Sequence, residues 1–145
     1  MACSRLTHYD PVAGACSAFV NRMVSDLCRG RGKEQAYLRA LSRCRDREVF
    51  EMLARFGRYE PVPGLDCLLA THAALTVFME NDTFEETLVS AVNLGGDADT
   101  VGAIAGSLAG SHYGIGAIPR RWLEGLHGLS RVTSAAWNLW NVVRE

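Results

Sequence analysis

The segment from Asn93 to Gly110 constrains the fold more than any other part of the sequence, because it joins a glycine-rich turn to a glycine-studded helix. Gly102, Gly106 and Gly110 recur every four residues and therefore lie on one face of the predicted helix. Each glycine costs roughly 0.8–1 kcal/mol relative to alanine inside a helix. We therefore expect a buried helix whose bare face lies close to another backbone or to a ligand, since such a contact would offset this cost.

The turn before this helix carries several oxygen ligands. Gly95 and Gly96 can adopt backbone conformations that a side chain disfavours, so the turn can direct Asp97 and Asp99 towards one point. Two carboxylates and the Thr100 hydroxyl are hard oxygen ligands of the kind that Mg²⁺ prefers. The same residue types are common as helix caps, and Thr100 is predicted to be the N-cap of the following helix. The residue pattern alone leaves both interpretations open.

The remainder of the chain has the apolar periodicity of helices and no convincing alternating strand. Asp10-Pro11 predicts a capped helix start, Thr83 with Glu86 forms a capping box, and Ser130 is the expected cap of the last helix. Residues 34–56 are expected to form either one kinked helix or two. We predict a single all-α domain over residues 1–145, packed as an irregular orthogonal bundle. Its expected helices cover residues 10–29, 34–43, 46–56, 65–79, 83–92, 101–110, 119–126 and 130–143.

Composition and cysteine usage exclude several classes of protein. The hydrophobic content of 48% is ordinary for a globular domain, and no apolar run is long enough to span a membrane. No hydrophobic segment follows the first residues as a signal peptide would, so we expect a cytoplasmic protein. The five cysteines are odd in number and form no Cys-x-x-Cys pair, which argues against a disulfide framework or a zinc site. Cys16 and Cys67 lie in apolar stretches and are expected to be inert thiols.

The formal net charge of −1 conceals a separation of charge along the chain. The stretch from Arg22 to Arg58 contains ten basic and five acidic residues, and the two kinds of charge are interleaved at helical spacings. We interpret this stretch as a solvated helix face and expect no nucleic-acid partner. Between Tyr59 and Pro119 there is no lysine or arginine, so the candidate metal turn lies in an acidic segment that favours cations.

Other chemistries fit the residues less well. An EF-hand that began at Asp97 would have Val101 and Leu108 at two of its ligand positions, so a calcium loop is excluded. Gly114-Ile115-Gly116 lacks the third glycine and the preceding strand of a dinucleotide loop. The histidines carry less information: His72 and His127 are predicted to be satisfied structural residues, and for His112 a place in a pocket wall stays open.

Two stretches of the chain resemble the ADP-ribosylglycohydrolase family. Residues 91–110, followed by Tyr113-Gly114, Ile118-Pro119 and Trp122, look like the C-terminal signature of that family. Thr7-His8 is similar to its mid-chain Thr-His motif, and this resemblance places His8 at the ligand cleft, whereas the residues alone favour a loop histidine. Ala98 stands where the family usually has threonine.

This resemblance implies a function and a set of site residues. The family reaction is the magnesium-dependent hydrolysis of an N- or O-glycosidic bond of an ADP-ribosylated protein. Asp97, Asp99 and Thr100 match the family's metal ligands in a two-magnesium site, and no catalytic residue is assigned. The residues expected to contact ADP-ribose are His8, Gly95, Gly96 and Tyr113.

The resemblance begins at the second half of the family domain. The family's first half carries a glycine-rich helix and a Thr-Asp-Asp cluster, and neither occurs in this sequence. We therefore expect the site to be completed by a complementary N-terminal-half chain. The other possibility, which we favour for covering the exposed apolar surface, is a homodimer, with the face of Gly102, Gly106 and Gly110 or its neighbour at or near the interface. The alternative is a non-catalytic helical module that keeps the fold and self-associates without metal.

Overall fold

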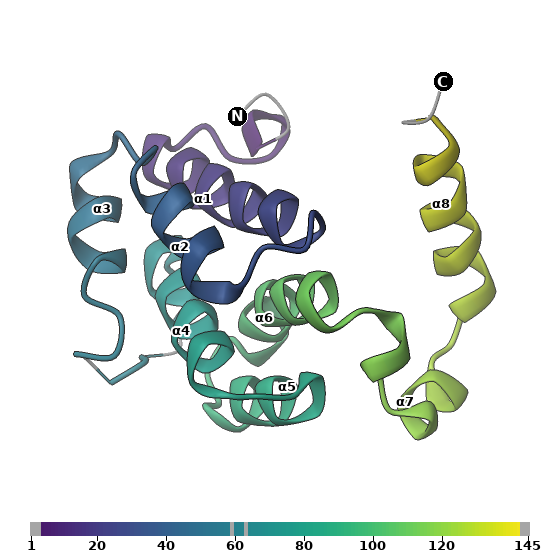
Figure 1. Ribbon diagram of the computed structural model, residues 1–145. Helices are drawn as coiled ribbons and strands as arrows, with labels where there is room; N and C mark the ends of the chain where they lie inside the picture. The colour runs from purple at the N-terminus through teal and green to yellow at the C-terminus, as the bar shows by residue number, and fades with distance from the viewer. Residues whose placement is uncertain (1–3, 59, 63, 143–145) are drawn as a thin grey trace.

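A computed structural model of the protein describes residues 4–58, 60–62 and 64–142. Regular structure within these residues is entirely helical, which confirms the all-α class (Figure 1). Two short 3-10 helices, η1 (Ser4–Leu6) and η2 (Ile115–Ala117), accompany the α-helices. The α-helices are α1 (Pro11–Leu27), α2 (Lys33–Leu41), α3 (Arg47–Leu53), α4 (Cys67–Glu80), α5 (Phe84–Asn93), α6 (Ala98–Tyr113), α7 (Arg120–Gly125) and α8 (Leu129–Val142).

Two of the predicted helix starts are confirmed in atomic detail. The Asp10 carboxylate accepts a hydrogen bond of 2.8 Å from the backbone N–H of Ala13, and Pro11 is the first residue of α1. The Thr83 hydroxyl oxygen accepts a hydrogen bond of 3.1 Å from the Glu86 backbone N–H, and it lies 2.9 Å from the Glu86 carboxylate. Local cap chemistry therefore sets where these helices begin.

Two other predicted starts are wrong. Thr100 is not an N-cap, because α6 already begins at Ala98 and its first helical hydrogen bond joins the Val101 N–H to the Asp97 carbonyl at 3.1 Å. Ser130 lies inside α8, which begins at Leu129. For residues 34–56 the structure decides between the two expectations, since α2 and α3 are separate helices.

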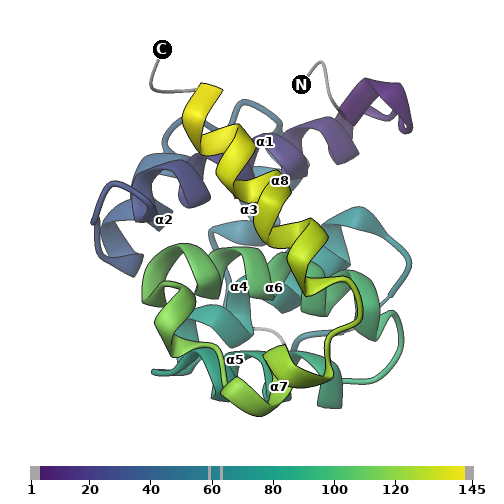
Figure 2. The same cartoon turned by 90° about the vertical axis from the view of Figure 1, so that its right-hand side faces the viewer.

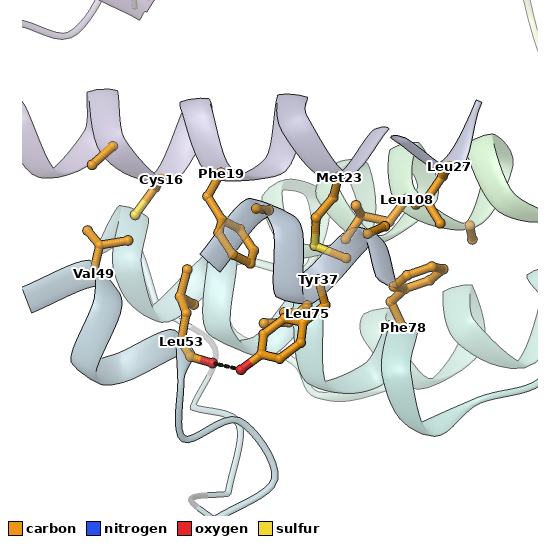
Figure 3. Close-up of a cluster of buried hydrophobic side chains, with 14 of the residues drawn as sticks. Cys16, Phe19, Met23, Leu27, Tyr37, Val49, Leu53, Leu75, Phe78 and Leu108 are labelled. Atoms are coloured by element: carbon orange, nitrogen blue, oxygen red, sulfur yellow. Dashed lines mark hydrogen bonds between the residues drawn. The ribbon is translucent and has the colours of Figure 1, made fainter. Parts of the chain in front are cut away.

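Helix α4 forms the centre of the bundle. Every residue from Thr71 to Phe78 is buried, and α1, α3, α5 and α6 all pack against this helix (Figures 1 and 2). Phe19 of α1, Leu75 of α4 and Leu108 of α6 meet in the main hydrophobic cluster (Figure 3). The core therefore fixes the position of α6, whose N-terminus carries the candidate metal ligands.

The glycine face of α6 packs against α5 of the same chain. A Cβ atom built on Gly102, Gly106 or Gly110 would lie 3.6, 3.5 or 3.9 Å from the nearest side-chain atom of α5. The expected close approach of another helix is thus present. Helix α5 covers this face within the chain, so a second copy would meet a neighbouring surface, and the expected homodimer stays a prediction. The side chains that cover the glycine face belong to Val92, Leu88 and Phe84.

Helix α8 stands apart from the bundle (Figure 1). None of its described residues is buried, although it carries large apolar side chains such as Trp137, which is 62% exposed. In the part of the chain that the structure describes, no helix combines the length and the apolarity that crossing a membrane requires. The exposed apolar residues of α8 are Val132, Trp137, Leu139, Trp140 and Val142.

Candidate functional site

The candidate site lies at the N-terminus of α6, where the helix follows its glycine turn. Gly95 and Gly96 both have positive φ angles, 75° and 58°, which lie in the left-handed region that favours glycine. They reverse the chain after α5 and deliver Asp97 to the position just before α6. The sequence-based role of the two glycines in shaping the turn therefore agrees with the backbone geometry.

The two carboxylates of the turn lie next to each other. The neighbouring Asp97 side chain, together with the backbone N–H groups of Thr100 and Asp99, holds the pKa of the Asp99 carboxyl below its usual value. Asp99 and Thr100 are exposed and Asp97 is half-buried, so these groups remain accessible. Two carboxyl groups this close repel each other unless a proton or a cation lies between them, so this pair can hold either one.

A shallow groove of about 260 Å³ begins beside Thr100 and runs between α1, α4 and α6. Its floor is mostly apolar, because α6 contributes Ile104 and α4 contributes Cys67 and Ala70. The thiol of Cys16, on α1, also lines it, and burial raises the pKa of that thiol to about 12. This agrees with the expectation of an inert cysteine. The remaining lining residues include Ala13, Ser17, Val20, Asn21 and Thr71.

The donor set fits magnesium in kind but not in number. Asp97, Asp99 and Thr100 would supply three hard oxygen atoms, whereas Mg²⁺ demands nearly octahedral coordination. Among the residues that the structure describes, there is no group of three or more histidine, cysteine, aspartate or glutamate side chains placed to hold a metal. A complete magnesium site would need further ligands from water, substrate or another segment.

The structure does not bring all the predicted ligand-binding residues to this turn. Tyr113 is the last residue of α6, so at 1.5 Å per residue it lies roughly 24 Å along the helix from Asp97. Its hydroxyl donates a hydrogen bond of 3.0 Å to the Asn81 carbonyl, which is a structural contact. His8 is exposed in the segment before α1, where its Nδ1 lies 2.9 Å from the Thr7 hydroxyl, and it does not line the groove.

The contribution of α1 to the groove was not predicted from the sequence. Ala13, Ser17 and Asn21 recur every four residues and line the groove opposite Thr100. This stripe of small and polar residues borders the apolar face of the helix. This four-residue periodicity could have predicted that α1 has a second, less hydrophobic surface beside its core-facing side.

The other histidines also have defined places. His112 is half-buried between the rings of Phe78 and Tyr113, with centroids 6.0 and 4.7 Å away, and burial together with the Lys33 charge lowers its pKa. His127 is exposed. His72 is buried as predicted, but its Nε2 atom makes no hydrogen bond within the described part of the chain, so it is not the satisfied histidine that we expected.

Comparison with known proteins identifies the family of this chain. The sequence model of the ADP-ribosylglycohydrolase family matches residues 1–145. This chain belongs to the ADP-ribosylglycohydrolase family. It is 37% identical over 129 residues to the ADP-ribosyl-[dinitrogen reductase] glycohydrolase of Rhodospirillum rubrum, a match that covers 87% of this chain and 42% of the relative.

The names of two further relatives also describe hydrolases of ADP-ribosyl groups. The ADP-ribosylarginine hydrolase Tri1 of Serratia proteamaculans is 28% identical over 148 residues, covering 98% of this chain and 40% of the relative. The ADP-ribosylhydrolase ARH3 of Mus musculus is 33% identical over 64 residues, covering 44% and 17%. The chain thus spans less than half the length of these curated relatives.

Proposed function

We propose that this chain forms one part of an ADP-ribosylglycohydrolase and carries half of a magnesium-dependent active site. The observation that carries this proposal is that the side chains of Asp97 and Asp99 are neighbours in the turn that leads to Thr100, and that Thr100 lines the groove. The reaction would be hydrolysis of the bond between ribose C1 and a modified side chain. The names of the relatives support ADP-ribosyl groups as the substrate class.

The residues of the turn have two tasks in this proposal. Asp97, Asp99 and Thr100 would hold Mg²⁺, which when bound would orient the ribose hydroxyls and polarise a water molecule. The exposed backbone of Gly95 and Gly96 leaves room for the ribose to approach the carboxylates. The remaining metal ligands would come from a complementary chain with the family's N-terminal half.

A second chain would also cover apolar surface. The groove floor and the apolar side chains of α8 are both open to solvent in this chain. A complementary chain would cover the groove and bring its ligands next to Thr100. A homodimer would cover α8 instead, since the glycine face of α6 is already covered.

The metal role can be tested by calorimetry with ADP-ribose and Mg²⁺. We expect binding by the wild-type chain to require Mg²⁺, and expect Asp97→Asn combined with Asp99→Asn to abolish it. Asp82→Asn is the matched control, because Asp82 is an exposed aspartate in the turn between α4 and α5. Equal Mg²⁺-dependent binding by the double variant and the control would rule out the metal role.

The catalytic role needs a separate measurement. ADP-ribosylated arginine and serine peptides would be incubated with the chain, alone and with a family N-terminal half. Release of ADP-ribose only from the mixture would support the proposal. No release from either, together with no Mg²⁺-dependent binding, would favour a non-catalytic helical module. That alternative draws on the small number of metal ligands in the described residues.

A further inference from the structure

A second cavity lies on the side of α1 that faces away from the groove at Thr100. It has a volume of about 540 Å³ and lies between α1, the segment before it and the connection from α2 to α3. Helix α1 presents Gly14 and Ala18 to this cavity, whereas it presents Cys16 and Val20 to the groove. Residues two positions apart in a helix are turned by about 200°, so the two sets face in opposite directions. The cavity is therefore separate from the candidate metal site.

The helix side of this cavity is hollow because a buried glycine leaves room there. Gly14 is buried inside α1, yet a Cβ atom built on it would meet no other part of the described chain within 4 Å. The glycines of α6 differ, since side chains of α5 lie 3.5–3.9 Å from their built Cβ atoms. Glycine destabilises a helix relative to alanine, and at Gly14 neither a close contact nor a positive φ angle requires it. The missing side chain leaves space that a ligand can fill.

Three arginines line the cavity: Arg22 of α1, and Arg43 and Arg45 of the connection from α2 to α3. Arg22 is half-buried, and its Nη1 donates a hydrogen bond of 2.8 Å to the Arg43 carbonyl, which holds its guanidinium group against that connection. Within the described residues, none of the three forms an ion pair. Guanidinium groups gathered around one cavity without a paired carboxylate repel one another and attract an anion.

Two carboxylates also line the cavity, but both already cap helices. The Asp10 carboxylate accepts the 2.8 Å hydrogen bond from the Ala13 N–H, and the Asp46 carboxylate accepts one of 3.1 Å from the Val49 N–H. Their charges are thus used at the starts of α1 and α3. With three arginines against two aspartates, the lining keeps a net positive charge.

The shape and chemistry of the cavity select one kind of molecule. The fork of N–H donors on a guanidinium group matches the oxygen atoms of a phosphate group, and several arginines can share its two negative charges. The volume of about 540 Å³ leaves room for an organic group beside the phosphate. Gly14, Ala15 and Ala18 offer that group a wall of small residues. A molecule that fits therefore joins a phosphate to a small organic group.

We propose that this cavity binds a small phosphate monoester, whose phosphate group is held by Arg22, Arg43 and Arg45. The organic group of the ester occupies the space over Gly14. The site goes beyond the proposed hydrolase function, because it shares no residue with the groove and needs neither magnesium nor ADP-ribose.

The proposal can be tested by calorimetry on the full, metal-free chain at low ionic strength, where charge interactions are least screened. Phenyl phosphate would be the probe, with phenol as the uncharged comparison and inorganic phosphate as the anion without an organic group. We expect saturable binding of phenyl phosphate, and binding of each comparison compound weaker by at least about tenfold. Absence of saturable binding would overturn the proposal, as would equal affinity for phenol. Equal affinity for inorganic phosphate would show a site for the free ion and would overturn the monoester.

A variant that fills the cavity tests its location. Gly14→Leu places a side chain where the built Cβ meets no other part of the described chain, so we expect a folded protein whose thermal midpoint is not lowered. Its affinity for phenyl phosphate should fall by at least about tenfold. Gly125→Leu is the matched control, because Gly125 is a helical glycine with open space around it on α7, and it should bind as wild type. Wild-type affinity of a folded Gly14→Leu variant would overturn the proposal.

A second variant tests the charges without touching the core. Arg43→Gln combined with Arg45→Gln removes two exposed guanidinium groups and should weaken phenyl phosphate binding by at least about tenfold. Arg58→Gln combined with Arg131→Gln removes the same charge at exposed positions outside the cavity and should have little effect. Equal affinities of the two double variants would overturn the proposal, even if Gly14→Leu did not fold.

Discussion

The Lys33 ammonium group donates a hydrogen bond to the Phe78 backbone carbonyl over 2.8 Å, so the first residue of α2 closes the C-terminus of α4. It also bonds to the Asn81 carbonyl, which in addition accepts the 3.0 Å hydrogen bond from Tyr113. Carbonyl groups at a helix C-terminus have no partner within the helix and attract cations. Lys33 therefore joins α2 to the end of the central helix, near the end of α6.

Replacing this lysine should destabilise the fold. Lys33→Met keeps the apolar stem but leaves the carbonyl groups of Phe78 and Asn81 short of a charged donor, so we expect a loss of about 1–3 kcal/mol. Urea unfolding of both proteins would measure it. Arg131→Met on the exposed helix α8 is the control and should leave the midpoint unchanged. If Lys33→Met changed the urea midpoint as little as Arg131→Met does, Lys33 would not stabilise the C-terminus of α4.

The features that the sequence predicted correctly depend on neighbours along the chain. The caps at Asp10 and Thr83 bind backbone groups three residues away, so their signal is contained in a few letters. The contact of Lys33 with Phe78 joins residues 45 positions apart, and no local pattern indicates it. The unpaired nitrogen of His72 escaped prediction for the same reason, because its surroundings come from α3 and the segment after it.

For the candidate site, the sequence likewise predicted local backbone geometry but not the positions of residues far apart along the chain. The conformation of Gly95 and Gly96 follows from their residue type, since both take φ angles that favour glycine. The start of α6 was placed too late because Asp97 serves as its N-cap residue without a capping hydrogen bond from its side chain. Tyr113 was grouped with the turn from its motif, although the length of a 16-residue helix separates them.

Gly106 offers a test of the packing between α5 and α6. A Cβ at this position would lie 3.5 Å from the Leu88 Cδ1 atom, an ordinary van der Waals distance. Gly106→Ala should therefore be neutral or stabilise the fold by up to about 1 kcal/mol through helix propensity. Gly106→Leu would push into Leu88 and should cost about 1–3 kcal/mol or more. Thermal unfolding would compare the two, and a stable leucine variant would show that α5 does not cover this face.

A fall in pH should destabilise the wild-type chain more than it destabilises the His72→Leu variant. Burial lowers the folded-state pKa of His72 below its ordinary value of 6.5, so the unfolded chain takes up a proton more readily than the folded one. Stability is therefore lost as the pH falls below that value. His112 has a shift in the same direction and is present in both proteins, so the difference isolates His72. Urea unfolding between about pH 7.5 and 5.5 should show a widening gap in favour of the variant. A constant gap would contradict a neutral, buried His72.

The exposed helix α8 should govern self-association but not the stability of the bundle. A chain truncated after Gly128 loses no buried side chain of α8, so its urea midpoint under dilute conditions should match that of the full chain. If a second copy covers the apolar side chains of α8, the full chain should dimerise in sedimentation velocity and the truncated chain should not. Trp137→Ser should weaken that dimer, whereas Asn138→Ser, on the neighbouring exposed position, should not. A full chain that stays monomeric at micromolar concentration would rule out the homodimer and leave a complementary chain as the partner to seek.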